Sequence, residues 1–475
     1  MSYSSVADMR RRLLEKTVTP VDLVTEAFDR INTVQPHLNC FVEIWSEEAH
    51  SRARELSRQQ ATAELMMDFP LFGIPIAIKD TTPWKEHQVS FGSVTHRHFI
   101  ADRSAYVVDA LVAAGAIIVG STNTPEFAHA SITDNPLTGA TRNPWNLERS
   151  PGGSSGGAGA AVASGCVALA EGSDMGGSVR IPAAWCGVVG LKPSLGRIPM
   201  DALPGLWDTL SHHGPLARSV DDIWEFLLAT QGPSRRDPWS VLSPLVRPQS
   251  KEQEMVSGLR VGLSIDLGCW AVDPEIAAVV QSAAGALNDA GAKVEVIDAG
   301  FTAEDEYLWI AMWSVFMASY YGHLLDTHRQ ELDPDVVRLI EAGNRMSAPE
   351  YKRLELRRTE IWQRMMGIFE HHDVIVCPTM AQAPKPATKI EERQRPAPPD
   401  DGLFHADDMT TVWNLVAPCP AVSVPGGRFE SGANAGLPIG VQIIGRPGRE
   451  DQILALARLI EAWSGSPTWT PNLNV

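Results

Sequence analysis

The stretch from residue 259 to residue 298 constrains the fold most, because it is predicted to form a strand, a helix and a second strand in close succession. The predicted strands are Leu259–Ser264 and Lys293–Asp298, and the predicted helix between them is Pro274–Asn288. Strands joined through a crossover helix pair in parallel within one sheet. Strands and helices also alternate along the rest of the chain, so we expect an α/β fold with a mixed or parallel central sheet flanked by helices.

The remaining pattern predicts helices at the start of the chain and again between residues 303 and 371. The apolar run Leu71–Ile78 is predicted to be a buried strand that ends at Lys79. The segment 378–399 is rich in proline and is predicted to be a loop. The other predicted strands are Ala116–Gly120, Gly187–Leu191, Asp373–Cys377, Ala421–Val424 and Ile439–Ile444, and the other predicted helices are Val21–Val34, Glu47–Gln59, Tyr106–Ala114 and Asp451–Trp463.

Charge and cysteine usage narrow the classes of partner. The chain has 40 basic and 57 acidic residues, a formal net charge of -17, which disfavours nucleic acid and anionic lipid as general partners. Its six cysteines are scattered without a C-x-x-C pair or zinc-type spacing, so we expect buried, reduced thiols. The first residues show no apolar signal-peptide core, and no apolar stretch is long enough to span a bilayer. We expect a soluble cytoplasmic protein.

Two loops rich in glycine and serine are the candidates for chemistry. They are Gly152–Gly157 and Gly172–Ser178, and between them the small-residue stretch Ala158–Ala170 is predicted to be helix or strand. Glycine allows the backbone to direct several N–H groups at one point, as an oxyanion hole for acyl transfer requires. Ser178, at the end of the second loop, is therefore a candidate nucleophile.

The residues alone leave the base for such a serine open. Any of the 13 histidines could serve, and the adjacent pair His212–His213 is the obvious candidate, although we expect both rings to be solvated in a Gly/Pro loop. Lys79 is the other candidate, because burial at the end of an apolar strand lowers the pKa of a lysine towards neutrality. The Gly153–Gly157 match to G-x-S-x-G lacks the strand that should precede it, and no zinc or nucleotide motif is present. We expect no metal and no cofactor.

Taken together, these stretches resemble the amidase signature family, in order and over nearly the whole chain. The resemblance extends to the nylon-oligomer and aryl-amide hydrolases of that family, through Arg142–Asn146 and Gly448–Asp451. The matching blocks are Gly73–Asp80, Thr122–Phe127, Thr141–Asn146, Pro151–Gly157, Asp174–Ala183, Cys186–Pro193, Gly214–Ser219 and Gly436–Gln442.

The resemblance implies a Ser-cisSer-Lys triad. In it Ser178 is the nucleophile, Ser154 is the bridging serine after a cis peptide bond, and Lys79 is the base. The implied oxyanion hole consists of backbone N–H groups, and two further serines are expected to hydrogen-bond to Lys79. The oxyanion residues are Met175, Gly176, Gly177 and Ser178, and the supporting serines are Ser155 and Ser173. We expect Asp174 and Arg180 to form a structural ion pair.

The resemblance also implies the organisation of the chain and its activity. We expect a helical segment over residues 1–66, packed on a single large amidase-signature catalytic domain over 67–475, with a variable, mostly helical insert at about 225–371. The expected activity is hydrolysis of a small-molecule amide through an acyl-enzyme, with esterase or urethanase side activity. The apolar segment Leu308–Phe316 is either core or a hydrophobic wall for the substrate, and in the second case favours an apolar or aryl amide, anilide or carbamate.

The alternative within the family is the glutaminase (A) subunit of a tRNA-dependent amidotransferase. That subunit carries a Tyr/Asp-rich stretch where this chain has the Arg- and Trp-containing segment Ser347–Glu370, which favours a free-standing amidase. A homodimer formed through the N-terminal helices is a further expectation from the family. A catalytically inactive relative that acts as a scaffold is disfavoured, because all three triad positions hold competent residues.

Overall fold

One mixed sheet of 11 strands organises the described part of the computed structural model, which covers residues 4–249, 252–389 and 399–473. The strands lie in the order β1-β3-β2-β4-β6-β5-β10-β11-β9-β7-β8. Antiparallel pairs occupy the middle of the sheet and parallel pairs lie on either side of them, and the edge strand β1 is antiparallel to β3. The strands are β1 (Phe41–Ile44), β2 (Pro75–Lys79), β3 (Ile117–Thr122), β4 (Leu169–Asp174), β5 (Val189–Lys192), β6 (His212–Ala217), β7 (Arg260–Leu263), β8 (Lys293–Val296), β9 (Val374–Pro378), β10 (Ala421–Arg428) and β11 (Pro438–Gly445).

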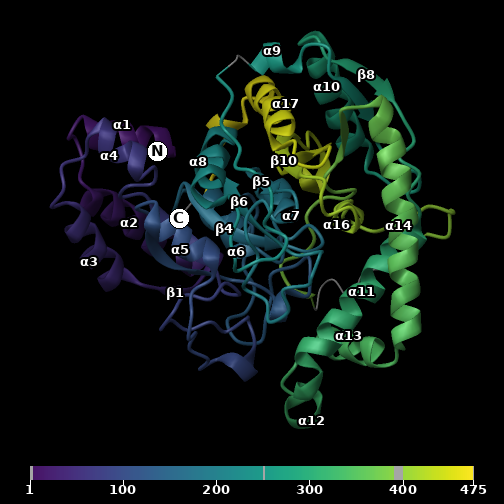
Figure 1. The fold of residues 1–475 in the computed structure, drawn as a ribbon, viewed down its shortest axis with the longest axis horizontal. Helices are drawn as coiled ribbons and strands as arrows, with labels where there is room; N and C mark the ends of the chain where they lie inside the picture. The colour runs from purple at the N-terminus through teal and green to yellow at the C-terminus, as the bar shows by residue number, and fades with distance from the viewer. Residues whose placement is uncertain (1–3, 250–251, 390–398, 474–475) are drawn as a thin grey trace.

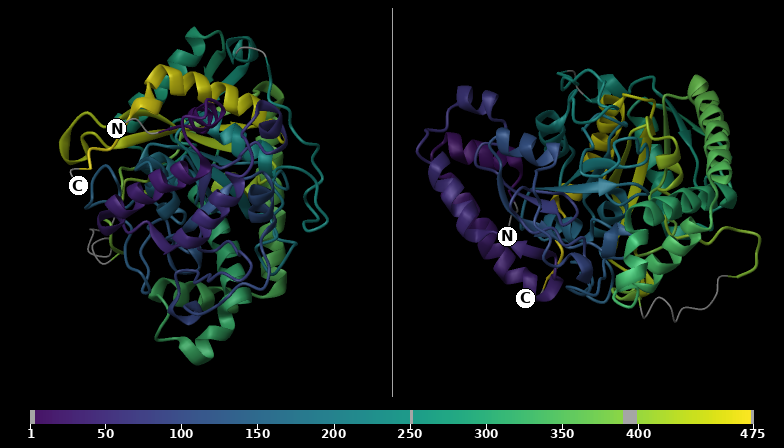
Figure 2. Two further views of the ribbon diagram at one scale, coloured as in Figure 1. Left: turned by 90° about the vertical axis from the view of Figure 1, so that its left-hand side faces the viewer. Right: turned by 60° about the horizontal axis from the view of Figure 1, so that its bottom comes forward.

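Helices cover this sheet, so the α/β prediction with a mixed sheet is confirmed. The N-terminal helices and the long helix α14 lie at opposite ends of the molecule (Figures 1 and 2). The helices are α1 (Val6–Leu14), α2 (Pro20–Leu38), α3 (Ser46–Leu56), α4 (Ala63–Asp68), α5 (Tyr106–Ala113), α6 (Gly156–Ala163), α7 (Arg180–Cys186), α8 (Val220–Thr230), α9 (Glu252–Val256), α10 (Pro274–Asp289), α11 (Ala303–Tyr321), α12 (Leu325–His328), α13 (Pro334–Asn344), α14 (Ala348–His371), α16 (Val412–Leu415) and α17 (Glu450–Ser464).

The strand–helix–strand unit forms as the sequence predicts. Asp273 caps α10 by accepting a hydrogen bond from the backbone N–H of Glu275, and Pro274 occupies the first helical turn, where its missing N–H costs nothing. The helix buries Ile276, Val280 and Leu287 against the sheet. Strands β7 and β8 then pair in parallel, from Arg260 with Lys293 to Leu263 with Val296.

Three predictions about the elements were wrong. Residues 41–44 form β1, an edge strand paired with β3, inside a segment predicted to be helical. The second glycine/serine loop is a strand over its first half, because β4 continues to Asp174. His212 and His213 are not solvated: they begin β6, which pairs antiparallel with β4, and their side chains are buried. Ladder pairing on both sides of β4 and β6 overrides the weak strand propensity of their Gly and Pro residues.

Other expectations hold. The six cysteines are unpaired and five of them are buried. Residues 303–371 are mostly helical. The proline-rich loop is irregular where it is described, and its residues 390–398 lie outside the described part. Among the described helices, none combines the length and the apolar character that crossing a bilayer would need.

Candidate active site

Lys79 ends strand β2 and its side chain is fully buried. Its ammonium nitrogen (Nζ) donates to Ser154 Oγ at 2.6 Å and to Ser173 Oγ at 3.0 Å. Burial lowers the pKa of Lys79 to about 7, although the carboxylates of Glu171 and Asp174 act in the opposite direction. A lysine with such a pKa is neutral for much of the time near neutral pH and can accept a proton.

Ser154 lies in the first glycine/serine loop, two residues before the start of α6. The peptide bond between Gly153 and Ser154 is cis, as expected from the resemblance. Small residues are needed here, because a Cβ on Gly153 would stand 2.6 Å from the carbonyl oxygen of Ala130. The close packing of this loop holds Ser154 against Lys79.

Ser178 lies on the turn between β4 and α7, and Asp174 organises that turn. Asp174 Oδ1 accepts a hydrogen bond from the N–H of Gly177 at 2.8 Å. The guanidinium of Arg180 donates to both oxygens of Asp174, at 2.8 and 2.9 Å, and both side chains are fully buried, so the expected structural ion pair is confirmed. The turn is thereby fixed around the Ser178 backbone.

The backbone N–H groups of this turn differ in availability. That of Gly177 is engaged by Asp174 and does not face a ligand. Within the described residues, the N–H groups of Met175, Gly176 and Ser178 donate to no acceptor of the chain. These three groups can therefore act as an oxyanion hole, a smaller set than the four residues expected from the sequence.

The two supporting serines behave differently from each other. Ser173 contacts Lys79 directly, as expected. Ser155 does not: its hydroxyl donates to the backbone carbonyl of Ser173 at 3.3 Å and so acts on the strand that carries Ser173. No hydrogen bond between the hydroxyls of Ser154 and Ser178 is found in the described chain, but both side chains line one cavity.

An aromatic cavity of about 440 Å³ opens from Ser154 and Ser178, and sequence reasoning identified only part of its wall. Trp313 and Phe316 of α11 line it, whereas Leu308 and Met312 of the same helix pack into the core. The segment Leu308–Phe316 is thus both core and cavity wall. The aromatic lining of this cavity is Phe91, Phe99, Phe127, Trp313, Phe316, Tyr320 and Tyr321.

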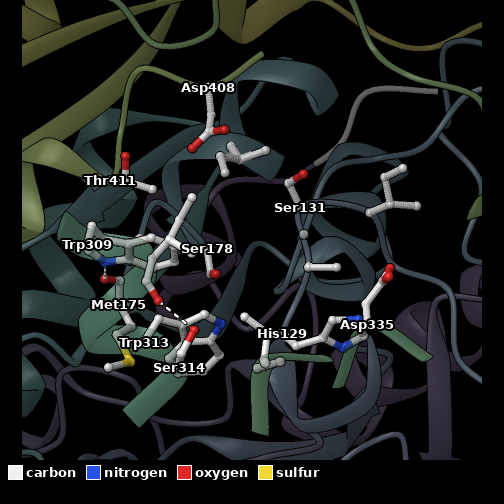
Figure 3. A pocket seen from close by; sticks show the side chains of 18 of the residues that line it. His129, Ser131, Met175, Ser178, Trp309, Trp313, Ser314, Asp335, Asp408 and Thr411 are labelled. Carbon is white, nitrogen blue, oxygen red and sulfur yellow. Dashed lines mark hydrogen bonds between the residues drawn. The ribbon is translucent and has the colours of Figure 1, made fainter. Parts of the chain in front are cut away.

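A second cavity of about 530 Å³, which is more polar than the first and is called the polar cavity here, meets the aromatic cavity at residues that include Ser178, Met175 and Trp313. Figure 3 shows Ser178 in the middle of this polar cavity, between Trp309 and Met175 on one side and Ser131 on the other. Trp309 donates its indole N–H to the carbonyl of Met175 at 2.9 Å, which ties α11 to the candidate oxyanion turn. Ser178 is therefore accessible from two compartments of different chemistry.

Two carboxyl groups of the polar cavity, those of Glu306 and Asp408, were not identified from the sequence. Burial and the neighbouring Asp408 raise the pKa of Glu306 to about 8, and burial and Asp407 raise that of Asp408 to about 6. Glu306 accepts a hydrogen bond from the Thr411 hydroxyl. These acids lie in segments without a local motif, so only the tertiary fold brings them together.

One group of residues at the edge of the polar cavity has the composition of a metal site. Ligand atoms of His129, Asp333 and Asp335 all lie within 4.8 Å of one another. The ammonium of Lys389 occupies the middle of this group, 2.6 Å from His129 Nε2 and 2.7 Å from Asp333 Oδ2. A lysine in that place supplies the positive charge, and the arrangement is a partly buried ion-pair network.

Comparison with known proteins agrees with this fold. The amidase family profile matches residues 22–454. An acylamidase from Rhodococcus erythropolis is 36% identical over 469 residues, which cover 97% of this chain and 96% of that protein. The glutamyl-tRNA(Gln) amidotransferase (A) subunit from Sulfurihydrogenibium sp. is 33% identical over 95% of this chain and 96% of its own length.

Solved structures show the same likeness. A bacterial aryl acylamidase of the amidase signature family superposes with a TM-score of 0.89 at 28% identity, over 98% of each chain. A 6-aminohexanoate cyclic dimer hydrolase superposes with a TM-score of 0.82 at 27% identity, over 99% of each chain. The fold and the site thus define an amide hydrolase. The chain belongs to the amidase signature family.

Proposed function

We propose that this protein hydrolyses apolar or aryl amides, anilides or carbamates through an acyl-enzyme on Ser178, without a partner subunit. The single observation that carries the proposal is the buried contact of Lys79 Nζ with Ser154 Oγ at 2.6 Å, at the base of a cavity that Ser178 shares. Such a contact between a desolvated lysine and a serine is the arrangement that activates a nucleophile.

In the acylation step, neutral Lys79 accepts the proton of Ser154, and Ser154 accepts the proton of Ser178. The Ser178 oxygen attacks the amide carbonyl carbon, and the N–H groups of Met175, Gly176 and Ser178 stabilise the negative charge on the carbonyl oxygen. Each such donor contributes about 3 kcal/mol to stabilisation of the transition state. The proton then returns through Ser154 to the amide nitrogen, the C–N bond breaks, and the amine leaves.

In the deacylation step, water attacks the ester formed on Ser178 and its proton follows the same path to Lys79. The carboxylic acid leaves and Ser178 regains its proton. Because the acyl-enzyme route requires only an acyl group and a leaving group, esters and carbamates of suitable shape are substrates as well. This is the basis for esterase and urethanase side activity.

The substrate class follows from the aromatic cavity. Burying an aromatic ring among Phe127, Trp313 and Phe316 is favourable through apolar area and ring stacking. Similarity to an acylamidase and to an aryl acylamidase supports the same class. The similarity to a cyclic dimer hydrolase supports cyclic as well as linear amides.

The second candidate is the glutaminase subunit of a tRNA-dependent amidotransferase, which the 33% identity to that subunit favours. Glutamine is small and zwitterionic. Asp102 and Arg103 are among the lining residues of the cavity, but its mainly aromatic wall suits an apolar ring better than charged groups. The free-standing amidase therefore fits this site better.

The proposal is tested by hydrolysis of a panel of anilides, aryl carbamates, primary amides and glutamine, with wild type and Ser178→Ala and without ATP or any added subunit. We expect wild type to hydrolyse the aryl substrates and Ser178→Ala to be inactive. Hydrolysis of glutamine alone, or dependence of all activity on an added subunit, would favour the second candidate.

A further inference from the structure

A buried pair, Glu171 and His213, lies directly behind Lys79 and has no part in the proton path described above. In the antiparallel pairing of β4 with β6, Ser173 is opposite His213. Alternate residues of a strand share a face and directly opposed residues share it too, so Glu171, Ser173 and His213 project on the same side of the sheet. This is the side on which Lys79 meets Ser173.

Glu171 holds His213 in one orientation. Glu171 Oε1 lies 2.8 Å from His213 Nδ1 and accepts a hydrogen bond from Thr82 Oγ1 at 3.1 Å. Its other oxygen accepts from the backbone N–H of Lys79 at 3.0 Å. Because a carboxylate only accepts hydrogen bonds, the Nδ1 atom of His213 carries a proton, and in the neutral ring Nε2 carries the lone pair.

The Nε2 atom of His213 is left without a partner. It is buried and has no hydrogen bond in the described chain, and the side chain as a whole is only 1% exposed. His213 nevertheless lines the aromatic cavity together with Ser154, Ser173 and Ser178. An unpaired buried acceptor is costly, so a group bound in the cavity that donates a hydrogen bond to it gains affinity.

An anilide or secondary amide offers such a donor at the reacting atom, its own N–H. The amide nitrogen must turn its lone pair towards Ser154 to receive a proton while its N–H points elsewhere. An acceptor on the cavity wall that binds this N–H holds the nitrogen in the required orientation. An ester has an oxygen in that place and gains nothing from the acceptor.

We propose that His213 Nε2 accepts a hydrogen bond from the N–H of the scissile amide, so that His213, oriented by Glu171, selects amides over the corresponding esters. This inference rests on the proposed function. In this step the bond from the Ser178 oxygen to the carbonyl carbon forms, the C–N bond breaks, and the Ser178 proton reaches the leaving nitrogen. His213 neither gains nor loses a proton.

The test compares 4'-nitroacetanilide with 4-nitrophenyl acetate, which share the acyl group and the nitrophenyl ring and differ in the N–H. His213→Asn keeps a donor for Glu171 and removes the Nε2 acceptor, whereas His213→Gln can place an amide oxygen near the Nε2 position. We expect His213→Asn to lower kcat/KM, which reports acylation, about five- to tenfold for the anilide and less than about twofold for the ester. His213→Gln should restore part of the loss. Equal losses on both substrates, or no loss on the anilide, would overturn the inference.

A binding measurement separates failure of this inference from failure of the proposed function. In the Ser178→Ala background, calorimetry gives the Kd of 4'-nitroacetanilide with and without His213→Asn. We expect the Kd to rise about five- to tenfold in the double variant. If wild type hydrolyses neither compound, the proposed function fails for this class, and the binding result still decides the inference. An unchanged Kd, or no binding of the anilide, would overturn it.

Discussion

Lys79 Nζ lies 2.6 Å from Ser154 Oγ and 3.0 Å from Ser173 Oγ, and within the described residues it forms no ion pair. The lysine is fully buried between the ends of β2 and β4, where its two hydrogen-bonding partners are serine hydroxyls. A lysine in such a place gives up its proton far more readily than one on the surface. This relationship is the reason that we propose Lys79, and not a histidine, as the base of the candidate site.

The pH dependence of activity follows from that lysine. Because burial lowers the pKa of Lys79 to about 7, kcat/KM for an anilide should rise as pH increases through about 7 and then level off, since only the neutral amine accepts a proton. Lys79→Met should lower kcat/KM by about 10²- to 10⁴-fold and remove this pH dependence. Rate profiles from about pH 5.5 to about pH 9.5 measure both effects. If the rise of kcat/KM with pH persists in Lys79→Met, a group other than Lys79 causes it.

The turn that carries Ser178 should tolerate no side chain at Gly177. Its φ is +115°, and a Cβ there would stand 1.9 Å from Thr410 Oγ1, whose hydroxyl bonds to the carbonyl of Gly176. We expect Gly177→Ala to lower kcat about 10²- to 10³-fold, because a shift of this turn displaces the oxyanion donors that flank Gly177, with little change in the circular dichroism spectrum. Gly285→Ala is the control, because a Cβ at that position of α10 meets nothing within 4 Å. Full activity of Gly177→Ala would contradict this role of the turn.

Asp174 should matter for stability as well as for activity. Burial alone would raise the pKa of Asp174, but Arg180 and Asn414 hold it well below its ordinary value. Asp174→Asn leaves the Arg180 charge buried without its partner and should cost about 3–5 kcal/mol of unfolding free energy at neutral pH.

The pH dependence of this stability has a definite sign. Because the folded-state pKa of Asp174 is depressed, its contribution is complete above the unfolded-state value of about 4 and is lost as pH falls below it. The difference between wild type and Asp174→Asn should therefore narrow between about pH 4 and about pH 3. Urea denaturation across this range measures it, and a constant difference would count against a stabilising ion pair.

The aromatic cavity predicts an effect on KM. Phe316 stacks on Trp313 with ring centroids 4.8 Å apart and lines the cavity. We expect Phe316→Ala to raise KM for anilides about tenfold with a small change in kcat, because the lost contact is made equally in ground and transition states. Tyr307→Ala on the same helix is the control, since Tyr307 is 60% exposed and lines neither cavity. Equal effects of the two variants would argue against the aryl-binding role.

Local pattern was sufficient to predict the parts of this molecule that depend on short-range chemistry. The buried strand that ends at Lys79, the crossover unit around α10 and the first glycine-rich loop appear where predicted, although that strand begins only at Pro75 and the second glycine-rich loop is a strand over its first half. The family resemblance supplied the cis bond before Ser154 and the place of Ser173 next to Lys79.

Features that depend on the partner of a residue could not be predicted from local pattern. The sequence around His212 and His213 resembles a loop, and only the pairing of β6 with β4 shows that they lie in a strand. Likewise, only the hydrogen bond to Asp174 shows that the Gly177 N–H is not available to a ligand. Glu306 and Asp408 lie about a hundred positions apart in the sequence, and only the packing of α11 against the segment before α16 brings them to one cavity.

The role of Ser178 as nucleophile is tested most directly by a covalent measurement. Wild type is mixed with 4-nitrophenyl acetate, quenched in acid within the first turnover, and examined by intact-mass and peptide mass spectrometry. We predict one acetyl group on the peptide that contains Ser178, no adduct in Ser178→Ala, and slower formation of the adduct in Lys79→Met. An acetyl group on another residue of the site, or an undiminished adduct in Ser178→Ala, would contradict this role.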